Sequence, residues 1–172
     1  MNEVYTIRSE KGDEYKLQFS TERSGVIAND ILDWFEGQGV VVVEIGLERT
    51  KGLHFTSHRV LAEIERCISE VILNNSNVIL FFFCDFISLL PTMRRDMSVQ
   101  EYRSRLFSRM FERYVAQHHI TGIFNRVTTV EGVAENYYFH VIARKHHLAF
   151  ADMISENIQK GFGKPADQSA KK

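Results

Sequence analysis

The sequence predicts an α+β fold, a single domain in which about four helices pack on a mixed β-sheet of about six strands. Val78–Phe83 is an unbroken apolar run, which is typical of a central strand covered on both faces. Stretches with strand-like alternation lie near both ends of the chain, and stretches with helical periodicity separate them. A chain of 172 residues with 44% hydrophobic residues is sufficient for one such core.

The N-terminal region is expected to form a hairpin followed by a short helix. The strands Val4–Arg8 and Glu14–Phe19 flank a turn-forming cluster of Glu, Lys, Gly and Asp. Helical spacing of apolar residues then predicts a helix over Val26–Glu36, which Gly37 ends. Trp34, the only tryptophan, is expected to anchor this helix in the core.

A strand–helix–strand unit is expected in the middle of the chain. The pattern predicts a second central strand at Val40–Leu47 and a helix that begins at Thr56 or Ser57 and continues to about Asn74. Residues 78–84 form the next predicted strand. A crossover helix between two strands is typical of a parallel pair, so these strands are expected to be parallel neighbours.

The helix that follows has the clearest start in the sequence. Ser98 and Glu101, three residues apart, form a capping box that satisfies two otherwise unpaired backbone amides. The helix is expected to extend to about Val115 and to place an apolar face on the sheet. This face comprises Val99, Tyr102, Leu106, Met110 and Tyr114, broadened by Phe107 and Phe111.

A second hairpin and a last helix complete the expected domain. The strands are residues 122–130 and Tyr137–Arg144, and the helix covers about His147–Lys160 with Leu148 on its buried face. Residues 163–172 are small and polar and contain Pro165. They are therefore expected to be a disordered tail that follows a single domain of residues 1–162.

One face of the helix after Ser98 carries a row of arginines spaced four residues apart, and two further arginines precede the helix. The set is Arg105, Arg109, Arg113, Arg94 and Arg95. A guanidinium group binds two oxygens at once, which suits a phosphate or carboxylate ligand. Such a row is also typical of a solvated face with local ion pairs, here between Glu101 and Arg105. The binding interpretation predicts a small non-catalytic intracellular binding or regulatory protein whose partner is an anionic ligand, a protein or a nucleic acid.

The alternative function is an enzyme with its site at the carboxyl end of the central strand. Asp85 directly follows this strand, and the strand ends of open sheets with helices on their faces border ligand crevices. With Arg94 or Arg95, Asp85 would act on a phosphate-containing substrate. If Glu44 converges with Asp85, acid–base or magnesium chemistry becomes available. The structural alternative is that Asp85 orders a turn and Glu44 marks a sheet edge.

A short motif resembles an uncharacterised family of small bacterial proteins. It combines the strand-end pair Cys84-Asp85 with Arg103, Leu106, Phe107 and Phe111 near the start of the next helix. The early Tyr- and Phe-rich hairpin fits the same layout. The resemblance covers about residues 1–145, roughly one domain length, and implies the same fold class. It implies no activity, because that family has no established one, and the apolar segment 86–97 with Pro91 departs from its pattern.

Composition and cysteine use indicate a soluble cytoplasmic protein. The net charge of −1 gives no global field that attracts nucleic acid or an anionic membrane. Cys67 and Cys84 occur in apolar surroundings, which is typical of reduced core thiols. Residues 1–8 are strand-like and carry a glutamate at position 3, unlike a signal peptide, and the longest apolar run is too short to cross a bilayer. No membrane partner is expected.

No metal or cofactor is expected. His54 and His58 have the spacing of two ligands on one helix face, but His54 precedes the predicted helix. Convergence of His140 with His146 and His147 is an open alternative. The ten glycines do not form a phosphate-cradling loop with a following lysine.

Self-association is a further hypothesis. The stretch Phe86–Leu90 is apolar, and an exposed apolar patch often marks an interface. The sequence therefore predicts a homodimer contact at this stretch.

Overall fold

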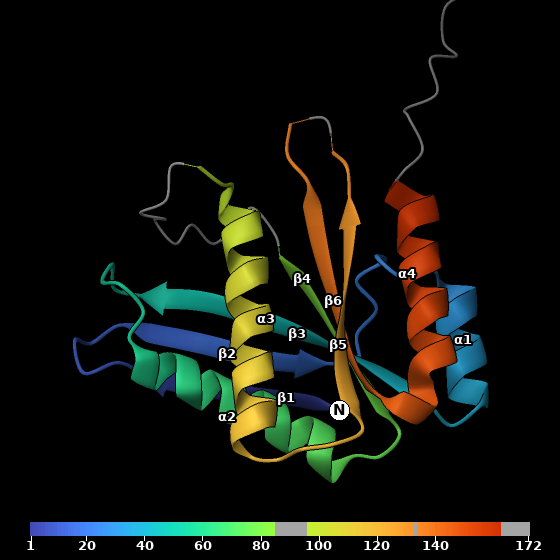
Figure 1. Ribbon diagram of the computed structural model, residues 1–172, viewed down its shortest axis with the longest axis horizontal. Coiled ribbons are helices and arrows are strands. Elements are labelled where there is room, and N and C mark those ends of the chain that lie inside the picture. Colours follow the sequence, from blue (N-terminus) through green and yellow to red (C-terminus); the bar gives the residue numbers. More distant parts are fainter. Residues whose placement is uncertain (85–95, 133, 163–172) are drawn as a thin grey trace, which may run out of the picture.

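The computed structural model describes residues 1–84, 96–132 and 134–162. These residues form six strands in one mixed sheet, in the order β1-β2-β3-β4-β6-β5, together with four α-helices (Figure 1). The predicted α+β class, with a six-stranded mixed sheet, is therefore confirmed. The predicted tail at 163–172 lies outside the described residues.

Antiparallel hairpins form the two ends of the sheet. The first consists of β1 (Asn2–Arg8) and β2 (Glu14–Ser20), and the second consists of β5 (Ile123–Val130) and β6 (Tyr137–Arg144). In β2, Tyr15, Leu17 and Phe19 are buried and alternate with half-exposed residues. This alternation, which is visible in the sequence, fixes which face of the hairpin packs on the core.

The middle of the chain forms the expected parallel pair. β3 (Val41–Lys51) is followed by α2 (His58–Asn74) and β4 (Val78–Cys84), and Val41–Ile45 pairs in parallel with residues 78–82. β4 then pairs with β6 in antiparallel register. β4 is therefore the central strand that joins the two halves of the sheet.

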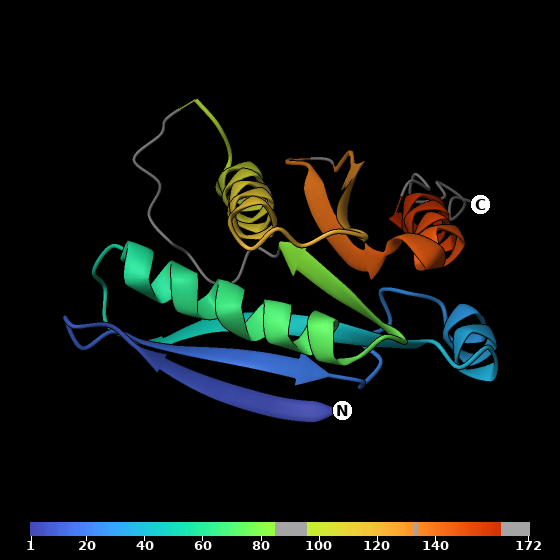
Figure 2. The ribbon, with the colours of Figure 1, turned by 60° about the horizontal axis from the view of Figure 1, so that its bottom comes forward.

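Each face of the sheet has its own hydrophobic core, and β4 contributes to both. On one face, Leu80 packs beneath α2 and α3 (Val99–Gln117). On the other face, Ile79 and Phe81 pack against α1 (Asn29–Gly37) and α4 (Leu148–Phe162). Figures 1 and 2 show α1 and α4 next to each other at one end of the molecule. None of these helices, in the described part of the chain, has the length and apolar character required to span a bilayer.

Serine caps begin two of the helices, as expected. The Ser57 hydroxyl accepts a hydrogen bond from the Val60 amide at the start of α2, and the Ser98 hydroxyl accepts one from the Glu101 amide at 3.1 Å. Each bond satisfies an amide that the helix itself leaves unpaired.

Removing the Ser98 cap is expected to destabilise the protein measurably. Ser98→Ala should lower the free energy of unfolding by about 1 kcal/mol, whereas Ser98→Gly should cost only about a few tenths, because glycine is tolerated at this position. Urea denaturation of both variants checks the difference. Equal losses for the two variants would show that the hydroxyl contributes little.

α1 begins at Asn29 instead of Val26, and Ile27 is buried before the helix starts. Its cap residue, Ala28, has no polar side chain, and its amide donates to the Asn157 side-chain oxygen of α4 at 3.0 Å. The start of α1 therefore depends on a residue 129 positions away, which local sequence patterns cannot indicate.

Two residues expected in the core are largely exposed. Trp34 is 48% exposed and Leu148 is 46% exposed. Trp34 lies at the surface between α1 and α4, where its ring contacts Phe150 with centroids 5.5 Å apart. Phe35, the next residue, is the one that is fully buried. Neighbouring residues point about 100° apart around a helix, so Phe35 is buried while Trp34 is exposed.

The face that α3 presents to the sheet matches the expected one only in part: Phe107 and Phe111 pack on the core as predicted. Its most buried residues are Gln100 and Ser104, with Phe107 and Phe111 packed on the core along the same face. The predicted face residues Leu106 and Met110 instead line a cleft. The prediction assigned only apolar residues to the buried face of α3, whereas the polar residues Gln100 and Ser104 are buried there.

Candidate functional site

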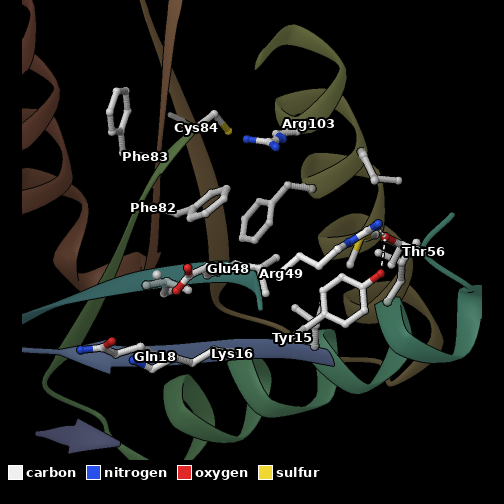
Figure 3. A pocket seen from close by; sticks show the side chains of 18 of the residues that line it. Tyr15, Lys16, Gln18, Glu48, Arg49, Thr56, Phe82, Phe83, Cys84 and Arg103 are labelled. Carbon is white, nitrogen blue, oxygen red and sulfur yellow. Dashed lines mark hydrogen bonds between the residues drawn. The ribbon is translucent and has the colours of Figure 1, made fainter. Parts of the chain in front are cut away.

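A cleft opens where the two parallel strands separate. Pairing between β3 and β4 ends at Ile45 and Phe82, after which β3 continues with β2 while β4 continues beside β6 (Figures 1 and 3). The resulting hollow of about 580 Å³ is bordered by Leu106, Phe107 and Met110 of α3. The carboxyl ends of adjacent strands in open α/β sheets commonly border ligand crevices.

A small polar network lies at one end of the cleft. The Thr56 side-chain oxygen lies 2.9 Å from the Tyr15 hydroxyl and accepts a hydrogen bond from the Arg49 guanidinium at 3.0 Å. The same guanidinium lies over the Tyr15 ring, 5.1 Å from its centroid. Its Nε is buried without a hydrogen-bond partner in the described part of the chain. These contacts hold the Arg49 side chain against the wall of the cleft.

The other end of the cleft lies at the carboxyl end of β4. Figure 3 shows Cys84 and Arg103 next to each other there, above Phe82. A hollow therefore lies at the carboxyl end of β4, where the sequence predicts a ligand crevice. Glu44 also borders this hollow. Asp85, the candidate catalytic residue, lies outside the described residues. Its convergence with Glu44 therefore stays a prediction.

A second hollow of about 500 Å³ lies between α3 and the β5–β6 hairpin. We call it the arginine groove because Arg105 and Arg109 lie on its α3 side. Hydroxyl groups also line it, and so do two carboxylates. The remaining lining residues are Glu101, Ser104, Ser108, Glu112, Val127, Thr129 and Tyr138.

The predicted row of three arginines is divided by the fold. Arg105 forms the expected ion pair with Glu101, at 2.6 Å, and Arg109 has no ion-pair partner among the described residues. Arg113 does not line the groove. Its charge instead interacts with Glu65 of α2. Burial raises the pKa of the Glu65 carboxyl, and the positive charge of Arg113 partly opposes this rise. Arg94 and Arg95 lie outside the described residues.

A chain of hydrogen bonds runs beneath the arginine groove. His140 Nε2 lies 2.9 Å from the Ser104 hydroxyl, and His140 Nδ1 lies 3.2 Å from the Asn125 side-chain oxygen. The Asn125 side-chain nitrogen donates to the Ser108 hydroxyl at 3.4 Å. The chain therefore ties α3 to β5 and β6.

The order serine, histidine, asparagine resembles that of a catalytic triad, but its surroundings favour a structural role. His140 is fully buried, and burial lowers its pKa to about 4, so the imidazole is neutral at pH 7. Ser104 is 4% exposed and lies inside α3, where backbone amides bond to helix carbonyls and cannot stabilise an oxyanion. The network holds the groove together.

His146 and His147 lie apart from His140. His146 and His147 are in contact with each other, and His147 packs on Phe150 beside α4, on the opposite face of the sheet from His140. The convergence left open by the sequence therefore does not occur. Within residues 1–84, 96–132 and 134–162, no group of three or more potential ligands could hold a metal ion.

His54 orders the loop before α2. Its backbone amide and its Nδ1 lie 3.0 and 3.1 Å from the Asp13 carboxylate, which also accepts a hydrogen bond from the Ser9 hydroxyl. Burial pushes the pKa of Asp13 up, but the hydrogen bonds from His54 and Ser9 outweigh it and hold the pKa below its usual value. His54 therefore pairs with Asp13 and does not share a helix face with His58.

Two features of these hollows were not predicted from the sequence. The extension of β3 to Lys51 forms a wall of the cleft, and the buried Ser104–His140 contact forms the floor of the groove. One signal was available. Gln100, Ser104, Phe107 and Phe111 have the spacing of one helix face, but two of these four residues are polar. The homodimer stretch Phe86–Leu90 lies outside the described residues.

Comparison with known proteins does not assign the chain to a group. No family model matches the sequence, and no curated protein matches it.

Proposed function

We propose that the protein is a small non-catalytic binding protein that holds an anionic ligand in the arginine groove. The observation that carries this proposal is the placement of Arg105 and Arg109 in one hollow with the hydroxyl-bearing residues Ser108, Thr129 and Tyr138. Guanidinium and hydroxyl groups together donate to the several oxygens of a phosphate or carboxylate.

Arg109 is the main binding residue in this proposal. Arg105 is already paired with Glu101 at 2.6 Å, whereas Arg109 has no ion-pair partner among the described residues. Glu112 also lines the groove, so the ligand must place its oxygens near Arg109 and away from this carboxylate. This arrangement favours a compact oxyanion over a long stretch of negative charge.

The groove favours binding over turnover because its floor is occupied by a closed network. Both ring nitrogens of His140 lie within hydrogen-bond distance of a side-chain oxygen, and the ring is buried. A proton-transfer group must reach the substrate, which this imidazole does not. We place the binding in the cytoplasm, consistent with buried cysteines at positions 67 and 84.

Charge reversal on α3 provides the test. Arg109→Glu should weaken the binding of inorganic pyrophosphate, measured by titration calorimetry at low salt, by at least about tenfold, since one charge-assisted contact becomes a repulsion. Arg113→Glu is the matched control: it makes the same charge change on the same helix but outside the groove, and binding should change less than about twofold.

A fluorescein-labelled RNA pool extends the test to nucleic acid. Binding that falls steeply with salt would indicate contacts with several phosphates, and Arg109→Glu should then reduce it more than Arg113→Glu. Equal effects of the two variants on both probes would contradict a groove-specific site. If the wild-type protein binds neither pyrophosphate nor the RNA pool, the proposal is contradicted.

A further inference from the structure

β3 extends beyond its pairing with β4. β3 runs to Lys51, and β2 pairs with it from Glu44 to Lys51. β4 pairs with it only as far as Ile45. From Gly46 onward, one edge of β3 therefore has no strand partner among the described residues, and this edge faces the cleft in Figure 3.

The backbone groups on this edge can be identified. The Val41 amide donates to the Asn77 carbonyl at 3.0 Å, so the backbone groups of Val41 face β4. Orientation alternates along a strand, which places the groups of Leu47 and Arg49 on the same edge and those of Gly46 and Glu48 toward β2. Two amides and two carbonyls, from Leu47 and Arg49, therefore face the cleft in the spacing of a β-ladder.

The lining of the cleft differs on the two sides of this edge. Leu47 points to the face covered by α2 and α3, where the cleft is lined by apolar side chains. Those from the two helices are Leu61, Ile64, Leu106, Phe107 and Met110. On the opposite face, β2 and β3 present polar side chains, which are Lys16, Gln18, Glu44 and Glu48.

We propose that this edge binds an extended peptide segment of a partner protein, which adds to the sheet as a strand beside β3. Backbone pairing would satisfy the amides and carbonyls of Leu47 and Arg49, as in other cases of strand addition. The bound segment alternates apolar side chains, which face α2 and α3, with polar ones. An apolar small molecule would fill the hollow but leave the backbone groups unpaired.

Length and charge further define the segment. The register between β2 and β3 shifts at Thr50. This residue has no partner in β2, because it lies between the pairs Tyr15–Arg49 and Glu14–Lys51. The segment therefore pairs over about four residues, or roughly 13 Å. On the polar face, Lys16 lies directly opposite Glu48, whereas Glu44 lies opposite Ser20. Glu44 therefore has no opposite charge across the β2–β3 pair. Its carboxylate favours a basic residue at a polar position of the peptide.

The first experiment uses synthetic peptides. A fluorescein-labelled heptapeptide that alternates Val or Ile with Lys or Thr is titrated with the full chain, and fluorescence anisotropy is measured. N-methylation at the alternate positions that pair with β3 should weaken binding at least about tenfold, because each methyl group removes a donor. N-methylation at the intervening positions should change binding less than about twofold. A peptide with Glu in place of Lys should bind more weakly.

The second experiment locates the peptide. Hydrogen exchange followed by NMR should show that the amides of Leu47 and Arg49 become protected when the peptide binds, while the already paired amides of Gly46 and Glu48 change little. Met110→Glu, which places a charge in the apolar part of the cleft, should weaken binding. Arg113→Glu, on the same helix but outside the cleft, should leave it unchanged.

Four outcomes would overturn the proposal. They are the absence of binding by any peptide of the alternating pattern, equal effects of N-methylation at both sets of positions, and protection of the Leu47 and Arg49 amides already in the free monomer. The fourth is a concentration-dependent dimer in light scattering that protects the same two amides, because the occupant would then be a second copy of the chain.

Discussion

Acidification from pH 7 to pH 5 is expected to lower the free energy of unfolding by about 2 kcal/mol through His140 alone. Burial lowers the pKa of this histidine to about 4 in the folded protein, whereas an unfolded chain has the ordinary value of about 6.5. The unfolded state therefore binds a proton first as the pH falls, and this uptake favours unfolding.

The pH window follows from these two values. At pH values well above 6.5 the imidazole is neutral in both states, and protonation of His140 costs no stability. The free energy of unfolding decreases as the pH falls toward 4, where the total loss through His140 reaches about 3 kcal/mol. His147 adds to this trend with the same sign, because burial and the nearby charges of His146 and Arg144 lower its pKa.

A pair of variants isolates the His140 contribution. His140→Gln removes the buried imidazole, and His146→Gln removes an exposed one. Urea denaturation at pH 7 and pH 5 should show a strong acid dependence in the wild-type protein and in His146→Gln, and a much weaker one in His140→Gln. His140→Gln should be less stable at pH 7 because His140 contacts Ser104 and Asn125. Identical acid dependence in all three proteins would contradict the burial argument.

Gly52→Ala is expected to lower the free energy of unfolding by about 3 kcal/mol, from backbone strain and overpacking together. Gly52 has a φ of +85°, where alanine is strained. A methyl group there would also lie 2.9 Å from the Asp13 Cα and would overlap the Asp13 carboxylate. That carboxylate cannot move aside without losing its hydrogen bonds to His54 and Ser9.

Gly12→Ala is the matched control. Gly12 has a nearly identical φ of +82°, but no atom lies within 4 Å of the added methyl group. Its cost should therefore be the strain alone, about 1 kcal/mol. Thermal denaturation of the two variants measures the difference. A Gly52 variant no less stable than the Gly12 variant would mean that the Asp13 loop readjusts freely.

The elements of the fold were largely predictable because their signals are local. Tyr137–Arg144 was predicted with its observed bounds, since its residues are strongly strand-forming. Ser98 marks the start of α3 through a bond to an amide only three residues away. The parallel pairing of β3 and β4 followed from the length of the crossover between them.

The hollows were not predictable in the same way because distant segments form them. Ser104 and His140 are 36 positions apart, and no local pattern indicates that a serine inside a helix will contact a histidine inside a strand. The arginine spacing predicted a common surface, but Arg113 lies close enough to Glu65 of α2 to affect its pKa and does not line the groove. Helical periodicity groups residues by angle and does not show which neighbour each one meets.

The central position of β4 has a consequence during synthesis on the ribosome. One side of this strand pairs with Val41–Ile45, which emerges earlier, but the other side waits for β6, which ends 60 residues later at Arg144. Until then, the nascent chain presents an unpaired, phenylalanine-rich strand edge, which is a template for aggregation. A ribosome stalled between these two strands should therefore carry a chain that depends on chaperones, whereas release after Arg144 should relieve that dependence.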